Sequence, residues 1–258
     1  MPYLEIDDFN MYYEVRGSGP ALTFAHGASG NRLMWWQQIP EFEKDYTCIS
    51  FDHRGWGSSV DDANNIKTSQ FASDLKALLD FLEIDKTAIV CQSMGGITGL
   101  NFSLTYPEMV SALVLADTTG GVGEQIVVDL LKNVSPPDHP TRRALTDSFI
   151  ANEPALTLLY EEIGLLNPKR ERSAVSSIFR DTSGPRKDTL DNFAIPIMFL
   201  VGESDLIFPP NVIEEVSKLF TNPTYHVIPE SAHASHFEQP NIFNKHLKLF
   251  LSNCIKYT

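Results

Sequence analysis

The chain is poor in cysteine and in basic residues. Its three cysteines, Cys48, Cys91 and Cys254, are odd in number, lie far apart and form no C-x-x-C pair, so we expect neither a disulfide framework nor a metal site built on thiolates. Lys and Arg number 20 against 33 Asp and Glu, a net charge of -13. This acidity disfavours binding to nucleic acid and to anionic membranes, and we interpret it as an aid to solubility.

We also find no pattern in the sequence that is typical of a signal peptide, a membrane segment or an internal repeat. The opening stretch, MPYLEIDDFNMYYEVRG, has early acidic residues and no apolar centre, so it is unlike a signal peptide. No run reaches the ~18 apolar residues that a membrane helix needs. We therefore expect a cytoplasmic protein with no membrane partner. The 258 residues, 43% of them hydrophobic and without internal repeats, are enough for one large globular domain.

Strand and helix patterns alternate along most of the chain. Residues 21–25 and 46–51 are nearly continuous apolar runs, which is typical of strands buried on both faces. RGSGP, residues 16–20, predicts a hairpin turn into the strand at 21–25, and residues 32–44 can form a helix that Pro40 interrupts. Further strands are predicted at 3–6, 11–15, 87–91, 109–116, 195–201 and 224–228, and helices at 69–84, 93–106, 211–220 and 241–253. The alternation predicts an α/β fold with a mostly parallel sheet and helices on both faces.

One interval, residues 121–193, breaks this alternation. It contains amphipathic helical patterns at 124–134, 141–150 and 154–166 without a convincing strand. We interpret it as a helical cap, or lid, inserted into a core domain made of residues 1–120 and 194–258. The insertion follows the carboxyl end of a strand, where open α/β sheets bind ligands, so we expect it to cover a substrate pocket; the alternative is that these helices only add packing.

VCQSMGG, residues 90–96, is similar to the nucleophile elbow G-x-S-x-G but lacks its first glycine. Cys91 stands at that position, and Gly95 occupies the second. A predicted strand precedes Ser93 and a predicted helix follows it, as an elbow requires. Ser93 is therefore our candidate nucleophile, although serine is also a common helix N-cap. We interpret Cys91 as a small, buried and inert strand residue.

A serine nucleophile needs a base and an acid that orients the base. Asp205 and His233 both follow predicted strands downstream of Ser93. They therefore stand in the order serine, acid, histidine that α/β-hydrolases use. Asp117 and Glu203 remain alternative acids.

The remaining site residues are predicted from their place beside these three. His236 is the alternative base or a residue of the pocket wall. For the oxyanion, we expect the backbone N–H groups of Met94 and Ala28, with His26 holding the loop of Ala28 by hydrogen bonds. The substrate pocket should be apolar and draw on Trp35, Met94 and Phe208.

Four segments together resemble the α/β-hydrolase superfamily. They are HGASGNRLMWWQQIPEFEKDYTCISFDHRGWGSS, CQSMGG, GESD and AHASHFEQP. They span nearly the whole chain and leave only the insertion unmatched. Within the first, FDHRGWGSS is similar to the D-x-R-G-x-G-x-S segment of that family, which helps to position the loops beside the site. The departure from the family pattern is Cys91.

The resemblance implies a function. Small single-cap members with QSMGG and LADTTGG are similar to 3-oxoadipate enol-lactonases and related carboxylic-ester hydrolases. It implies a serine hydrolase that cleaves a small apolar ester or lactone through an acyl-enzyme on Ser93, with no cofactor and no metal. The alternatives are a sensor of a lactone-type signal with slow hydrolysis, and a carbon–carbon bond hydrolase with the same triad. Haloalkane dehalogenation is disfavoured, because that chemistry uses Asp where Ser93 stands.

Overall fold

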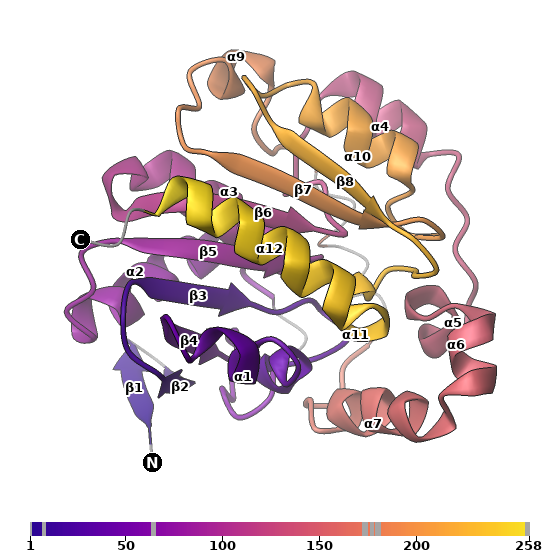
Figure 1. Cartoon of the computed structure of the whole chain (residues 1–258), viewed down its shortest axis with the longest axis horizontal. Coiled ribbons are helices and arrows are strands. Elements are labelled where there is room, and N and C mark those ends of the chain that lie inside the picture. The colour runs from indigo at the N-terminus through magenta and orange to yellow at the C-terminus, as the bar shows by residue number, and fades with distance from the viewer. Residues whose placement is uncertain are drawn as a thin grey trace.

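A single sheet organises the molecule. The computed structural model describes residues 2–6, 9–62, 66–171, 175, 178 and 182–255. Its sheet has eight strands in the order β1-β2-β4-β3-β5-β6-β7-β8, with only the β1–β2 and β2–β4 pairs antiparallel. The predicted α/β class is confirmed (Figure 1). The strands are β1 (Tyr3–Ile6), β2 (Phe9–Arg16), β3 (Ala21–Ala25), β4 (Thr47–Phe51), β5 (Thr87–Gln92), β6 (Val110–Ala116), β7 (Ile197–Gly202) and β8 (Thr224–Ile228).

Helices cover both faces of the sheet, and the centre of β5 shows why a strand in this position is apolar. Ile89 and Cys91 belong to the core on one face, and Ala88 and Val90 to the core on the other. Successive side chains of a strand alternate between faces, so a strand covered on both sides is apolar at its central positions, and the polar Thr87 and Gln92 lie at its two ends. One face carries α2 (Phe71–Phe81), α3 (Gly95–Thr105) and α10 (Pro210–Ser217), and the other carries α1 (Ile39–Phe42) and α12 (Pro240–Cys254).

The hairpin predicted at RGSGP is wrong. The turn exists, with Gly17 and Gly19 in the left-handed region at φ 78° and 125°, but β2 does not pair with β3. Instead, β4 lies between them and pairs with β2 antiparallel and with β3 parallel. A turn pattern reports local backbone geometry, whereas the pairing here is decided by β4, which comes later in the chain.

The helix predicted over residues 32–44 is also different. The segment forms a 3₁₀ turn, η1 (Arg32–Trp35), followed by α1. Pro40 lies in the first turn of α1, where a missing N–H costs no intrahelical hydrogen bond. It therefore helps to start a short helix instead of interrupting a long one. The other short elements are η2 (Thr68–Gln70), η3 (Pro107–Met109) and α11 (Ser235–Glu238).

Between β6 and β7 the described residues form helices and no strand. Residues 172–174, 176, 177 and 179–181 of this interval lie outside the described part. In Figure 1, α5, α6 and α7 lie beyond the carboxyl ends of the parallel strands, while α4 lies beside α10. The pattern at 141–150 is divided in two, because Thr146 caps a new helix. The helices are α4 (Gln125–Leu131), α5 (Pro140–Ala144), α6 (Asp147–Asn152), α7 (Pro154–Leu165) and α9 (Lys187–Leu190).

Candidate active site

Ser93 lies on a sharp turn between β5 and α3. Its φ is 50°, a left-handed conformation that a non-glycine residue adopts at a cost. Its N–H donates to the carbonyl of Ala116 on the neighbouring strand, at 3.0 Å. A Cβ on Gly95 would lie 2.2 Å from the carbonyl oxygen of Ala25, so this position admits only glycine. The geometry is that of a nucleophile elbow.

Cys91 does not crowd the elbow. Its Sγ points toward Gly99 in the middle of α3, where an added Cβ would lie 2.2 Å away. The side chain is fully buried, and burial raises the pKa of the Cys91 thiol. A thiol in this state is a poor nucleophile, which agrees with the interpretation of Cys91 as an inert packing residue.

A chain of two hydrogen bonds joins Ser93, His233 and Asp205. Ser93 Oγ lies 2.8 Å from His233 Nε2, and His233 Nδ1 lies 2.9 Å from Asp205 Oδ2. The three residues are 3%, 4% and 2% exposed, so little water competes for these bonds. The second oxygen of Asp205 accepts the N–H groups of Ile207 and Phe208 at 2.7 and 3.0 Å, which fixes the carboxylate in the orientation that the imidazole needs.

The alternative acids do not reach His233. Glu203 is exposed, and its carboxylate accepts the N–H of Glu230. Asp117 is buried, but one of its oxygens accepts the N–H of Gly202 at 2.8 Å and the other accepts the N–H and hydroxyl of Ser235. The structure therefore brings Asp205 to the imidazole, as the sequence predicted.

Asp117 interacts electrostatically with Asp205 and His233. Burial raises the pKa of Asp117, and the neighbouring charge of Asp205 raises it further. Burial alone would lower the pKa of His233, but Asp205, through its charge and its hydrogen bond, and then Asp117 hold it above its ordinary value. Asp205 thus favours the imidazolium form that a general base acquires when it takes a proton.

The two predicted oxyanion donors are free to bind a ligand. Across the described ranges, neither the Met94 N–H nor the Ala28 N–H donates to a protein acceptor. Both residues pack in one cluster with Trp56, and an added Cβ on Gly27 would lie 3.0 Å from the Cβ of Ser93. The loop after β3 therefore passes close to the serine, as an oxyanion loop does.

His26 holds this loop. Its Nε2 accepts the backbone N–H of His53 at 3.0 Å, so the proton lies on Nδ1, which donates to the carbonyl of Gly27 at 2.8 Å. Burial lowers the pKa of His26 to about 4, which keeps the ring neutral and the two bonds intact at neutral pH. The predicted structural role of His26 is confirmed.

A cavity of about 310 Å³ opens beside Ser93. Phe208 lines it, as predicted. The prediction for Trp35 and His236 is wrong, because these residues are 0% and 2% exposed and pack on each other in the core, with ring centroids 4.7 Å apart. Met94 is likewise fully buried and packs in a cluster with Trp56 and Phe71. The other lining residues are Ile97, Thr118, Thr119, Gly121, Val122, Val128, Leu131, Lys132, Ile178 and Thr182.

Most of these lining residues escaped the sequence prediction. Val128 and Leu131 lie on α4 of the insertion, and their signal was the amphipathic pattern at 124–134. Periodicity identifies the apolar side of such a helix but does not say which part of the sheet it faces.

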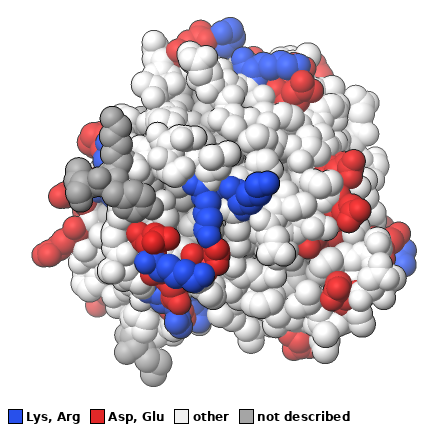
Figure 2. Space-filling view, viewed as in Figure 1, with Lys and Arg blue, Asp and Glu red and all other residues white. Residues whose placement is uncertain are grey.

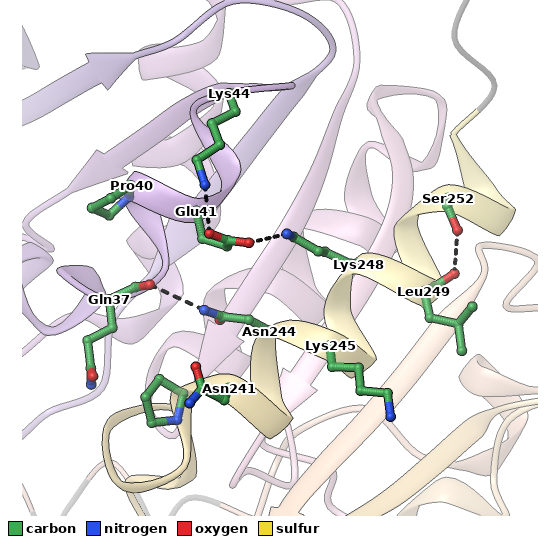
Figure 3. Close-up of a pocket in the computed structure, with 11 residues that line it drawn as sticks. Gln37, Pro40, Glu41, Lys44, Asn241, Asn244, Lys245, Lys248, Leu249 and Ser252 are labelled. Carbon is green, nitrogen blue, oxygen red and sulfur yellow. Dashed lines mark hydrogen bonds and ion pairs between the residues drawn. The ribbon is translucent and has the colours of Figure 1, made fainter.

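A larger and more open hollow of about 1010 Å³ lies between α1 and α12 (Figure 3). Most of its lining residues carry polar or charged side chains, and Glu41 lies between Lys44, at 2.9 Å, and Lys248. It contains none of Ser93, His233 or Asp205.

On the face shown in Figure 2, acidic and basic side chains are interspersed among uncharged surface. Within the described ranges, no cluster of three or more His, Cys, Asp or Glu side chains could hold a metal ion, and no helix is both long and apolar enough to cross a bilayer.

A serine on an elbow, joined to histidine and aspartate at the carboxyl edge of a mostly parallel sheet, is the arrangement of the α/β-hydrolases. Residues 20–182 and 160–240 match the model of the family described as alpha/beta hydrolase fold. The chain belongs to this family and is a hydrolase.

Relatives and solved structures agree in fold over almost the full length. The chain is 27% identical over 251 residues to 3-oxoadipate enol-lactonase 2 of Acinetobacter baylyi, with 93% of this chain and 92% of the relative covered. The enol-lactonase from Burkholderia xenovorans LB400 superposes with a TM-score of 0.82 at 18% identity, over 97% and 100% of the two chains. Est816, an N-acyl homoserine lactone degrading enzyme, superposes with a TM-score of 0.81 at 24% identity, over 96% and 100%.

Proposed function

We propose that this hydrolase cleaves a small carboxylic ester or lactone through an acyl-enzyme on Ser93. The observation that carries the proposal is the hydrogen-bond chain from Ser93 Oγ through His233 to Asp205, with both bonds under 3 Å and all three residues buried. A serine hydroxyl is a weak nucleophile alone, and a histidine held in this way supplies the base that it lacks.

The chemistry proceeds in two stages. In the first, His233 Nε2 takes the hydroxyl proton while Ser93 Oγ attacks the carbonyl carbon, and the imidazolium then gives that proton to the departing alkoxide oxygen. In the second, His233 takes a proton from water, whose oxygen attacks the acyl-enzyme, and returns the proton to Ser93 as the acid leaves. Asp205 holds the Nδ1–H and stabilises the imidazolium in both stages. The N–H groups of Ala28 and Met94 bind the oxyanion.

The cavity supports a small, mainly apolar substrate. Its volume of about 310 Å³ is at the lower end of the range for ligand pockets. Ile97, Val122 and Phe208 are apolar residues of its lining, and Thr118 and Thr119 are polar ones. The names of the relatives, an enol-lactonase and a homoserine lactone degrading enzyme, support a lactone or ester as the substrate class.

Residues 121–193 act as a cap in this proposal. Several cavity residues belong to this segment, among them Val122, Val128 and Leu131, while Ser93 and Phe208 come from the core formed by residues 1–120 and 194–258. A wall built from the insertion would shield the acyl-enzyme from bulk water and set the length of substrate that fits.

Two measurements on the same preparation test this proposal. Hydrolysis of p-nitrophenyl acetate by the wild type should fall by roughly 10⁴-fold or more in Ser93→Ala, because the covalent route is lost. A fluorophosphonate should label the wild type on the peptide that contains Ser93 and leave the variant unlabelled. Equal turnover by both proteins would exclude Ser93 as the nucleophile, and a single turnover followed by arrest would favour a sensor of lactone-type ligands.

A further inference from the structure

Glu238 is a buried carboxylate outside the triad. It ends α11 and is 6% exposed. Its Oε1 accepts the N–H of Ala232 at 2.6 Å, and its Oε2 accepts both the N–H and the hydroxyl of Thr146 at 2.8 Å. Every one of these contacts uses the carboxylate as an acceptor, and an ionised carboxylate, which has no proton of its own, is the group that such a site fits.

Thr146 belongs to the insertion. It is the N-cap of α6, where its Oγ1 accepts the N–H of Phe149 at 3.1 Å. With this lone pair occupied, the hydroxyl proton is directed to Glu238. Glu238 therefore anchors the first turn of α6 to the core.

The backbone on each side of His233 is attached to the insertion. Ala232, just before it, is held through Glu238, and Ala234, just after it, donates its N–H to the carbonyl of Ala144 at 2.9 Å. On the core side, the carbonyl of His233 accepts the side-chain amide of Gln92 at 2.7 Å. The position of His233 thus depends on residues 144–146 as well as on the sheet.

Apolar packing reinforces this contact between the insertion and the core. The ring of Phe237 meets the rings of Tyr160 and Phe149 edge-on, at centroid separations of 5.2 and 6.2 Å. The same cluster contains Leu145 and Ala234. A displacement of α6 and α7 would therefore move the loop of His233 with them.

We propose that Glu238 is a positioning residue that couples the placement of the insertion to the placement of His233 against Ser93. Across the described ranges, it makes no hydrogen bond to the side chains of Ser93, His233 or Asp205, so the hydrogen bonds that link it to His233 run through the backbone. This inference rests on the proposed function of Ser93 and His233. A misplacement of about 1 Å at such a base is enough to reduce turnover by about 100-fold.

Glu238→Gln tests the coupling, because the side chain keeps its size. Whichever way the amide turns, its NH₂ faces an N–H donor of Ala232 or of Thr146. We expect kcat for p-nitrophenyl acetate to fall roughly 10- to 100-fold, with a much smaller change in KM. The matched control is Glu161→Gln, since Glu161 is an exposed residue of α7 that accepts the hydroxyl of Thr141 within the insertion. This control should keep the wild-type kcat.

A second pair of variants covers the case in which Glu238→Gln does not fold. Thr146→Val removes the hydroxyl bond to Glu238, whereas Thr146→Ser keeps it. We expect a reduced kcat in the valine variant and recovery in the serine variant.

The readout that does not depend on turnover is the downfield proton resonance of His233 Nδ1–H. It should shift or broaden in Glu238→Gln and Thr146→Val and stay unchanged in Glu161→Gln. The proposal would be overturned if folded Glu238→Gln kept the wild-type kcat and an unchanged resonance. If Glu238→Gln does not fold, the same result in Thr146→Val would overturn it. Absence of ester hydrolysis in the wild type would instead count against the proposed function. The two failures can be distinguished, because the His233 Nδ1–H resonance can be compared among the variants even without hydrolysis.

Discussion

The elbow depends on two close approaches between its residues and the elements around it. Gly95 faces the end of β3, where an added Cβ would lie 2.2 Å from the Ala25 carbonyl oxygen, and Gly99 faces Cys91 Sγ at the same distance. Glycine is thus required on the α3 side of the turn in both cases. On the β5 side, the Cys91 thiol fills the space left by the missing side chain of Gly99. Cys91 therefore differs from the family motif without disturbing the turn.

This pairing predicts a specific non-additivity. Gly99→Ala alone should lower the free energy of unfolding by about 1–3 kcal/mol, the usual cost of overpacking a core. Cys91→Ala removes the Sγ that the new methyl group meets, so the double variant should regain most of that loss. Urea denaturation of the wild type, both single variants and the double variant gives the coupling free energy. Simply additive losses would show that Cys91 and Gly99 are not complementary.

Ser93, Asp205 and His233 could be predicted because each one follows a strand that is recognisable from its run of apolar residues. The choice between Asp117 and Asp205 could only be ranked, since both come at strand ends. It is decided by Gly202 and Ser235, which occupy the Asp117 carboxylate from distant parts of the chain. Trp35 was mispredicted for a similar reason, because composition does not say whether a large aromatic residue faces a cavity or the core.

At the scale of elements, local patterns located the strands but not all of their pairings. The apolar runs at β3 and β4 were recognised because both faces are covered. The position of β4 between β2 and β3 was missed, because it depends on pairing between segments about thirty residues apart, such as Arg16 with Cys48. Pro40 shows the same limit in a helix, since its effect depends on whether the helix begins before it or at it.

The contact between α7 and the loop after β3 is an element-scale feature with a testable energy. Asn31 is 1% exposed; its Oδ1 accepts the Leu33 N–H and its Nδ2 donates to the Ile163 carbonyl near the end of α7. Asn31→Asp keeps the acceptor but places a carboxylate oxygen against that carbonyl, at the negative end of the helix dipole.

We expect Asn31→Asp to lower the free energy of unfolding by about 1–3 kcal/mol, measured by urea denaturation. Asn152→Asp is the control, because Asn152 is an exposed residue at the end of α6 whose amide donates to Ser148 within its own helix. Equal effects of the two changes would mean that the α7 contact contributes nothing particular to stability.

At the scale of the whole molecule, buried titratable groups give opposing pH dependences. Burial lowers the pKa of His26 to about 4, of His236 to about 3, and of His53 well below its ordinary 6.5. Their folded forms bind fewer protons than the unfolded chain, so the stability that they contribute is lost as the pH falls below 6.5. Burial raises the pKa of Asp117 and Glu238, and their contribution is lost as the pH rises. His233, whose pKa is also raised, acts in the same direction as these two carboxyls. The two sets of residues therefore oppose each other, and the histidine contribution has to be measured at a single residue.

His236 isolates the histidine contribution. Both of its ring nitrogens lack a partner among the described residues, and its ring packs on Trp35 and Phe243 at centroid distances of 4.7 and 6.0 Å. His236→Phe removes the titrating group and keeps an aromatic ring in that space. Between pH 6.5 and about 3, the wild type should lose stability relative to the variant by up to about 1.4 kcal/mol per pH unit. Urea denaturation across this window measures the difference, with exposed His139→Gln as control; parallel curves for His236→Phe and wild type would show that His236 titrates alike in the folded and unfolded chain.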